Sequence, residues 1–261
     1  MELALPGTAA ALSLALAWSM LRRFAARHRL HELIWGVTFV AFGVAAGAEF
    51  YATLFGWTPA LVRLYYLAGA SLSVGFLALG TLVLLLPRRI ALVALGVVLV
   101  QSLFMVFLVL RSNVDPVLIR DAGWSALGRD GSLRALALTI NVLGTMVVLI
   151  GTFGSAYSQW ASAAPGTGSR ALGVFQIGVG TLIVATGGSL TRYGHHLLYG
   201  PMVLGLLVIF VGYRRATRSS GRAAVAAPRV THESAPVPGQ PDATMGTHDA
   251  GRDAWPSRSQ G

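Results

Sequence analysis

The stretch HELIWGVTFVAFGVAAGAEFYATLFGW, residues 31–57, indicates the class of fold to which this chain belongs. It is apolar over more than the roughly 20 residues that an α-helix needs to cross the hydrocarbon layer of a bilayer. One acidic residue, Glu49, lies inside the run. An ionisable group is costly in such a segment, so we expect Glu49 either to have a partner or to serve a function.

The composition of the whole chain is typical of a membrane protein. Of its 261 residues, 54% are hydrophobic and only 11% are charged, whereas a soluble domain carries about 25% charged residues. The chain has no cysteine, which excludes disulfides, thiolate metal sites and cysteine nucleophiles. Its 20 basic residues are all arginine, so a site that needs a Schiff-base lysine is excluded as well.

Seven apolar segments follow one another along the chain, each near the length of a spanning helix. They cover residues 3–21, 32–56, 59–86, 90–110, 135–158, 171–190 and 195–213. The sequence therefore predicts an all-α, polytopic membrane protein with seven transmembrane helices. The first segment is followed, not preceded, by its positive charges, which is not the order of a cleaved signal peptide.

The arginines between these segments predict the orientation of the chain. Most of them lie in alternate loops, after the first, third and fifth segments, and at the C-terminus. The long loop between the fourth and fifth segments also holds arginines, but aspartates accompany them. Because positively charged loops stay in the cytoplasm, we expect the N-terminus outside and the C-terminus inside the inner (plasma) membrane of a bacterium. The net charge of +10 does not indicate nucleic-acid binding, since there is no basic stripe with interleaved aromatic residues.

Two parts of the chain lie outside the seven segments. Residues 1–214 are expected to form the transmembrane bundle, and residues 215–261, rich in Pro, Ser, Gly and Ala, are expected to form a disordered cytoplasmic tail. That tail is either plain terminal disorder or a docking segment for a cytoplasmic partner. The long loop 111–134 has a helix-start signal at Asp115 and Pro116, and it either covers the outer mouth of the bundle as a lid or rests on the lipid surface.

The neighbours of Glu49 one turn away are small residues, which mark a face where another helix approaches. The turn near Trp57 brings Arg63 of the next segment to a similar depth, so we expect an ion pair between Glu49 and Arg63, with Tyr66 as a further donor to the carboxylate. The pair is interpreted either as structural or as a proton or cation site in which Glu49 titrates.

Two further sets of polar residues are candidates for a ligand or proton site. Asn141 and Thr145 open a polar face of the fifth segment that we expect to look inward, where the amide of Gln176 meets it. The stretch TRYGHHLLYGP, residues 191–201, places Arg192, His195 and His196 at the outer end of the sixth and seventh segments. Adjacent histidines on a helix diverge by about 100° and form no chelating pair, so we predict no metal and consider a pH-sensing or interfacial role.

No sequence motif of a known enzyme class is present, and we predict no catalytic residue and no cofactor. Glycine is abundant, with 31 residues, and pairs such as Gly43 and Gly47 permit close helix approach or a homo-oligomer contact. The expected partners are the lipid bilayer, a second copy or another membrane protein, and a cytoplasmic partner of the tail, but not nucleic acid.

The stretch GWTPALVRLYYLAGASLSVGFLALGTLVLL, residues 56–85, resembles a segment of uncharacterised bacterial seven-helix membrane proteins. These proteins share a glutamate in the second helix and an R-x-Y-Y-x-x-G-A opening of the third, which here begins at Arg63. The resemblance covers residues 35–86 and implies no activity. Two hypotheses about function follow from the sequence: a non-catalytic sensor, ligand-binding or accessory subunit with an outward-facing polar cavity, or a small transporter or proton-coupled carrier that uses Glu49.

Overall fold

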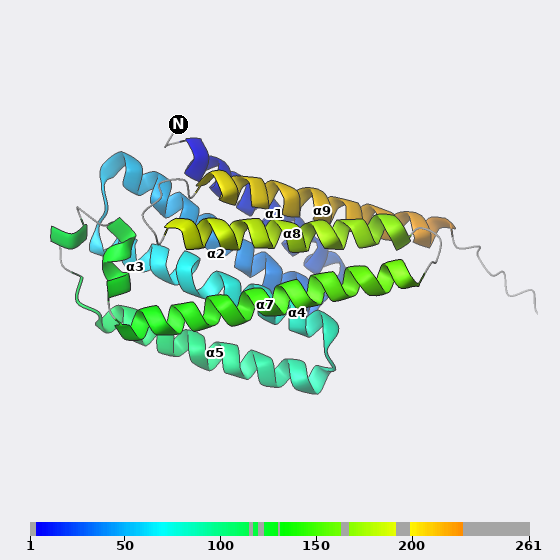
Figure 1. Cartoon of the computed structure of the whole chain (residues 1–261), viewed down its shortest axis with the longest axis horizontal. Coiled ribbons are helices and arrows are strands. Elements are labelled where there is room, and N and C mark those ends of the chain that lie inside the picture. Colours follow the sequence, from blue (N-terminus) through cyan, green and yellow to red (C-terminus); the bar gives the residue numbers. More distant parts are fainter. Residues whose placement is uncertain are drawn as a thin grey trace, which may run out of the picture. The chain divides into compact units, whose positions relative to one another are not determined.

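The structure is a computed structural model of the chain, and it describes residues 4–114, 117–119, 123–129, 131–162, 167–191 and 199–226. These residues form helices and no strands, which confirms the all-α prediction. The elements, shown in Figure 1, are α1 (Ala4–Arg27), α2 (Leu30–Phe55), α3 (Pro59–Tyr65), η1 (Tyr66–Leu72), α4 (Ser73–Leu85), α5 (Arg88–Arg111), η2 (Gly123–Arg129), α7 (Gly131–Ala161), α8 (Thr167–Thr191) and α9 (Tyr199–Ala226).

Six helical segments are long and apolar enough to cross a membrane. They are Ala4–Arg27, Leu30–Phe55, Pro59–Leu85, Arg88–Arg111, Gly131–Ala161 and Thr167–Gly187. The remaining long helix, α9, is apolar only over residues 200–213, because Arg214 and Arg215 follow at once. That stretch is shorter than the roughly 20 residues of a typical span.

The segment that the sequence predicts as a single span, 59–86, is one continuous helical path with a π-helical middle. Thr58 caps its start by accepting a hydrogen bond from the backbone N–H of Leu61 at 3.3 Å, and Pro59 supplies the fixed φ of a first helical residue. Where η1 passes into α4, the hydroxyl of Ser73 donates to the carbonyl of Ala68, five residues earlier. Such π-helical turns are frequent at functional sites.

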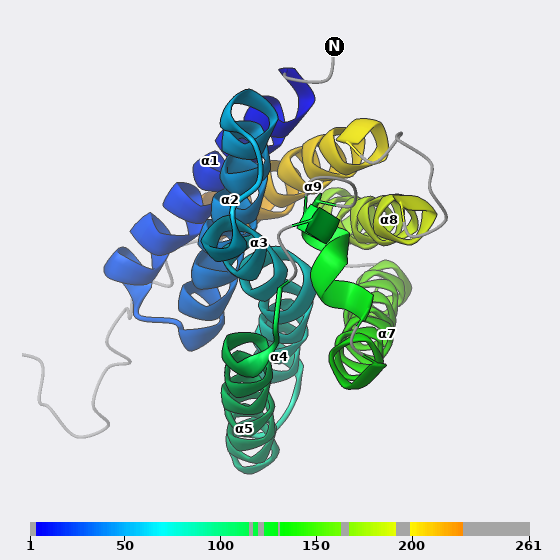
Figure 2. The ribbon, with the colours of Figure 1, turned by 90° about the vertical axis from the view of Figure 1, so that its left-hand side faces the viewer.

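The helices form a bundle within the compact unit Met1–Ala224. The chain order brings α1 against α2, α2 against α4, α4 against α7, and α7 against α8, and buried residues of α1, α2 and α9 form a shared core around Leu16, Phe39 and Leu206. Figure 2 shows α5 at the edge of the bundle, beside α4.

We name the two ends of the bundle by a residue in each. The Trp57 end holds the α2–α3 turn and η2, and the Arg23 end holds the α1–α2 and α4–α5 turns. At the Arg23 end α9 continues to Ala226, past the boundary at 214 where the sequence predicted a disordered tail to begin. The rest of that tail lies outside the described residues.

Candidate ligand cavity

The bundle encloses a cavity of about 440 Å³ between α2, the α3–η1–α4 path, α7, α8 and α9. Cavities of this size lie within the range of small-molecule sites. The residues of α7 that line the cavity lie between positions 138 and 149. Their spacings of three and four residues place them on one helix face, about 16 Å long. Asn141 and Thr145, two of the residues selected from sequence, belong to this face and line the cavity.

The wall of the cavity is mostly apolar, where the sequence predicted a polar one. Its apolar lining includes Phe39, Phe42 and Leu206, and the described lining residues include no charged side chain. The polar stripe on α7 is outnumbered, because the other helices line the cavity mainly with apolar side chains.

Four polar side chains in the wall donate hydrogen bonds to carbonyl groups earlier in their own helical segments. Thr38 donates to the carbonyl of Ile34 at 2.9 Å, and Thr181 makes the same bond one turn back on α8 at 2.9 Å. The Nδ2 of Asn141 donates to the carbonyl of Ala137 at 2.7 Å, and the hydroxyl of Ser73 is likewise engaged within its helix. At these four positions the wall therefore offers the cavity few free donors.

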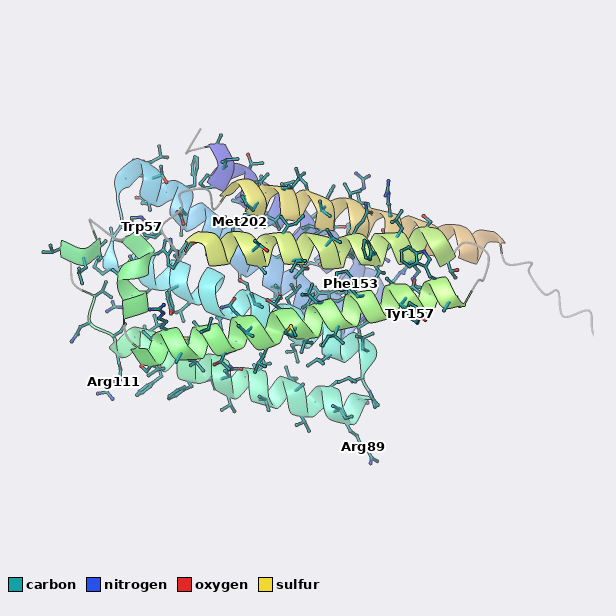
Figure 3. All side chains as sticks on the ribbon, viewed as in Figure 1. Trp57, Arg89, Arg111, Phe153, Tyr157 and Met202 are labelled. Atoms are coloured by element: carbon teal, nitrogen blue, oxygen red, sulfur yellow. The ribbon has the colours of Figure 1, made fainter. Side chains whose placement is uncertain are left out.

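A cluster of aromatic rings closes the cavity at the Trp57 end. Trp124 lines the cavity, and its ring centroid is 5.3 Å from that of Tyr65, which in turn meets Trp57 edge-on at 5.5 Å. Gly123, with φ of +55°, brings the backbone of η2 so close to Trp57 that an added Cβ would lie 2.9 Å from the indole nitrogen. Trp57 is labelled in Figure 3, at the end of the bundle that η2 covers.

Two more side chains of the loop are packed into the bundle. Ile119 is 2% exposed and Leu127 is 3% exposed, and both belong to a core cluster with Val62 of α3 and Met105 of α5. Of the two interpretations of loop 111–134, the structure supports the lid, because a connector resting on lipid would not bury these residues in the protein.

The ion pair that the sequence predicts between Glu49 and Arg63 is not formed. Arg63 instead donates from Nη2 to the carbonyl of Ser112 at 3.1 Å, because the segment after α5 returns across the start of α3. The hydroxyl of Tyr66 donates to the carbonyl of Leu133 at 3.4 Å. Glu49 has one carboxylate oxygen, Oε2, shielded from solvent, and it is not among the residues that line the cavity.

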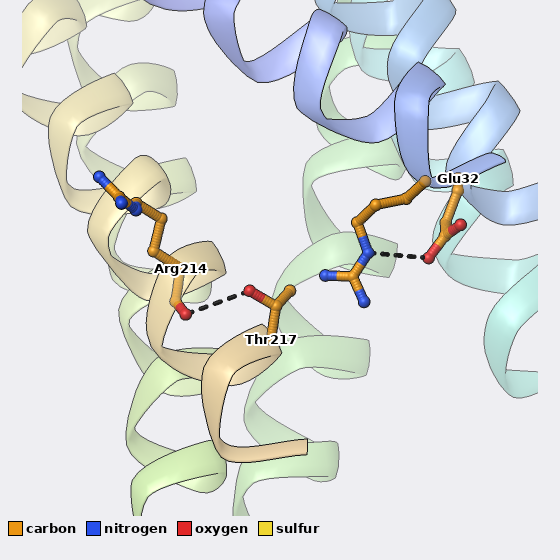
Figure 4. A network of polar contacts seen from close by, with 4 residues as sticks. Glu32, Arg214 and Thr217 are labelled. Atoms are coloured by element: carbon orange, nitrogen blue, oxygen red, sulfur yellow. Dashed lines mark hydrogen bonds and ion pairs between the residues drawn. The ribbon is translucent and has the colours of Figure 1, made fainter. Parts of the chain in front are cut away.

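An ion pair that sequence analysis missed lies at the Arg23 end. Nε of Arg23 is 3.4 Å from Oε1 of Glu32, as Figure 4 shows, and Glu32 is only 6% exposed. The Arg23 guanidinium also lies 5.7 Å from the ring centroid of Tyr213 on α9. Opposite charges on either side of a short turn between two spans were the signal in the sequence that could have identified this pair.

Of the remaining predicted site residues, the described structure places only Gln176, and it does not line the cavity. The side-chain oxygen of Gln176 accepts a hydrogen bond from Nη1 of Arg215 at 3.2 Å, so Gln176 faces α9 and does not meet the Asn141 face as the sequence predicted. Arg192, His195 and His196 lie outside the described residues. Within the described part of the chain, no group of three or more histidines and acidic residues is placed to hold a metal ion.

Comparison with known proteins leaves the chain without a family assignment. No family model matches it, no curated protein matches it, and no solved structure matches it. The geometry of the cavity and its lid is therefore the basis for any statement about function.

Proposed function

We propose that this protein is a non-catalytic integral membrane protein that binds an apolar small molecule in the cavity. In this role it is a sensor, a ligand-binding protein or an accessory subunit of a larger membrane assembly. The observation that carries the proposal is a cavity of about 440 Å³ with a mostly apolar wall, closed at one end by the rings of Trp57, Tyr65 and Trp124. Such a wall favours an apolar ligand and offers little to an ion.

The proposal includes the placement of the protein in a membrane. Six apolar helices support a membrane location. We propose that α9 is a seventh span. Its arginines then anchor its end at the cytoplasmic surface of a bacterial inner membrane. With an odd number of spans the N-terminus is outside, and the lid then lies on the outer face. A second copy, another membrane protein and a cytoplasmic partner of the tail remain proposed partners.

The alternative function is a small transporter or proton-coupled carrier that uses Glu49. The observation that favours it is the shielded Oε2 of Glu49 in an apolar helix, since ionisable groups within spans often serve proton pathways. Proteoliposomes that contain a pH-sensitive dye distinguish the two functions. Proton flux that is lost in Glu49→Gln supports the carrier, and absence of flux supports the binding protein.

A photoreactive apolar probe tests the proposed function directly. Adamantyl diazirine, reconstituted with the protein in phosphatidylcholine vesicles and activated by light, should label cavity residues such as Phe42 and Ser73. Thr145→Trp, which fills the cavity from α7, should lose this labelling. The matched control, Leu143→Trp, places the same ring on a face of α7 that is 61% exposed and outside the cavity wall, and it should retain the label. Equal labelling of the interior in both variants, or none in the wild type, would contradict the proposal.

A further inference from the structure

The wall of the cavity is buried on most sides and exposed on one. The described lining residues of α2, α4 and α9 are buried or half-buried, and the most inaccessible include Ala45 at 2%, Ser73 at 1% and Leu206 at 1% exposed. On α7 and α8, by contrast, four of the lining residues lie partly at the molecular surface. Their exposed fractions are 47% for Leu138, 52% for Val142, 53% for Met146 and 46% for Leu182.

The packing of α7 on α8 explains why the cavity opens between these two helices. Near the Arg23 end they are in close contact: the rings of Phe153 and Phe175 are 5.4 Å apart, and a Cβ added to Gly178 would lie 2.6 Å from Oγ1 of Thr152. Figure 1 shows the two helices diverging from this end toward the Trp57 end. The exposed lining residues belong to the diverging half.

The opening faces the side of the bundle and not its end. Both helices are long and apolar enough to span a membrane, and other exposed residues of α7, such as Leu143 at 61% and Ile150 at 69%, are apolar as well. In a bilayer this surface contacts hydrocarbon. At the Trp57 end the cavity is lined by Trp124 and Tyr65, whose ring centroids are 5.3 Å apart.

From these observations we infer that one hydrocarbon chain of a membrane lipid enters the cavity sideways, through the opening between α7 and α8. This inference rests on the proposed function and names the class of its ligand. The cavity follows α7 for about 16 Å with a volume of only about 440 Å³, so it is long and narrow, which is the shape of an extended chain. The lipid head group stays outside, because the described wall holds no charged side chain and the hydroxyl donors of Thr38 and Thr181 are bonded to their own helices.

A second photoreactive probe tests the sideways route. The probe is phosphatidylcholine with a diazirine near the end of one acyl chain, and its head group cannot leave the membrane surface. Activated in vesicles, it should label Ser73 and Phe42 inside the cavity as well as lipid-facing residues of α5 such as Leu103, which is 70% exposed. Mass spectrometry of the digested protein locates the labels.

The two probes together separate failure of this inference from failure of the proposed function. If adamantyl diazirine labels the cavity interior and the lipid probe labels only the outer surface, the cavity exists but is closed to lipid chains, and the inference is overturned. If neither probe reaches the interior, the proposed function itself fails. Labelling of the interior by both probes supports both statements.

A variant at the opening provides the specific control. Val142→Trp places a large ring in the opening and should abolish labelling of Ser73 by the lipid probe, while labelling of Leu103 stays unchanged. Leu143→Trp, one position along the same helix but outside the cavity wall, should leave both labels unchanged. Loss of the Ser73 label in both variants would show a general disturbance of α7 and would overturn the assignment of the opening.

Discussion

At the scale of single residues, Arg23 and Glu32 form a partly buried ion pair between α1 and α2. Their side chains are 25% and 8% exposed, so both charges are largely removed from water. A buried charge that loses its partner is costly, and the loss of both charges together is less costly than the sum of the separate losses. The pair also joins the α1–α2 turn to α9 through the contact of Arg23 with Tyr213.

We therefore predict strong coupling between Arg23 and Glu32. Glu32→Gln and Arg23→Gln should each lower the free energy of unfolding in detergent, and the double variant should lose less than the sum, with a coupling of about 0.5–3 kcal/mol. Denaturation in mixed micelles measures all three variants. Arg89→Gln is the control, because Arg89 is exposed and points away from the bundle in Figure 3. Additive losses would show that the two charges do not interact.

At the scale of the elements, α8 and α9 pack through glycines that face each other. A Cβ added to Gly180 would lie 2.7 Å from the carbonyl oxygen of Gly205, and one added to Gly173 would lie 2.7 Å from the carbonyl oxygen of Gly212. Backbone atoms cannot move aside as a flexible side chain can. The two helices therefore approach as closely as they do only because these four positions have no side chain.

We predict that Gly180→Ala destabilises the protein by about 1–3 kcal/mol, the usual cost of overpacking a core. The matched control is Gly154→Ala on α7, where an added Cβ meets nothing within 4 Å. That change should cause no loss, since alanine favours a helix over glycine by up to about 1 kcal/mol. The melting temperature of the two purified variants, measured side by side, tests the prediction, and equal values would exclude the close α8–α9 contact.

At the scale of the whole molecule, the two ends of the bundle differ in charge, because several arginines gather at the Arg23 end. α9 carries Arg214 and Arg215 directly after its apolar part, and the Arg23 end also holds Arg22 and Arg27 beside Arg23. Because loops rich in arginine remain in the cytoplasm, the Arg23 end is expected on that side and the lid on the other.

This orientation gives a prediction for reporter fusions. A reporter that is active only in the cytoplasm should work when fused after Ala226 and fail when fused at Gly128, and an alkaline phosphatase fusion should give the reverse pattern. Cytoplasmic activity at both positions would mean that the number of spans between them is even. In that case α9 lies on the membrane surface rather than across it.

Six of the seven spans predicted from the sequence correspond to apolar helices of the described structure. The prediction of residues 59–86 corresponds to Pro59–Leu85, and the prediction of residues 90–110 corresponds to Arg88–Arg111. These limits are local properties, because the length of an apolar run and the proline or arginine at its edge decide where a helix can begin and end. The inward position of Asn141 and Thr145 followed from the same kind of argument, since a polar face cannot be turned to lipid.

Only the tertiary structure decided which residues meet. A helix places Arg63 at a given depth but does not determine which neighbour lies opposite, and the neighbour is Ser112, 49 residues along the chain. In the same way, Gln176 faces α9 rather than α7. The two glycines of the GxxxG pattern also differ, because Gly43 packs close to Leu14 of α1 whereas Gly47 faces open space. The exposure of Val142 and Leu182, and with it the side on which the cavity opens, depends on the angle between α7 and α8. That angle follows from packing between residues distant in sequence, which local periodicity does not contain.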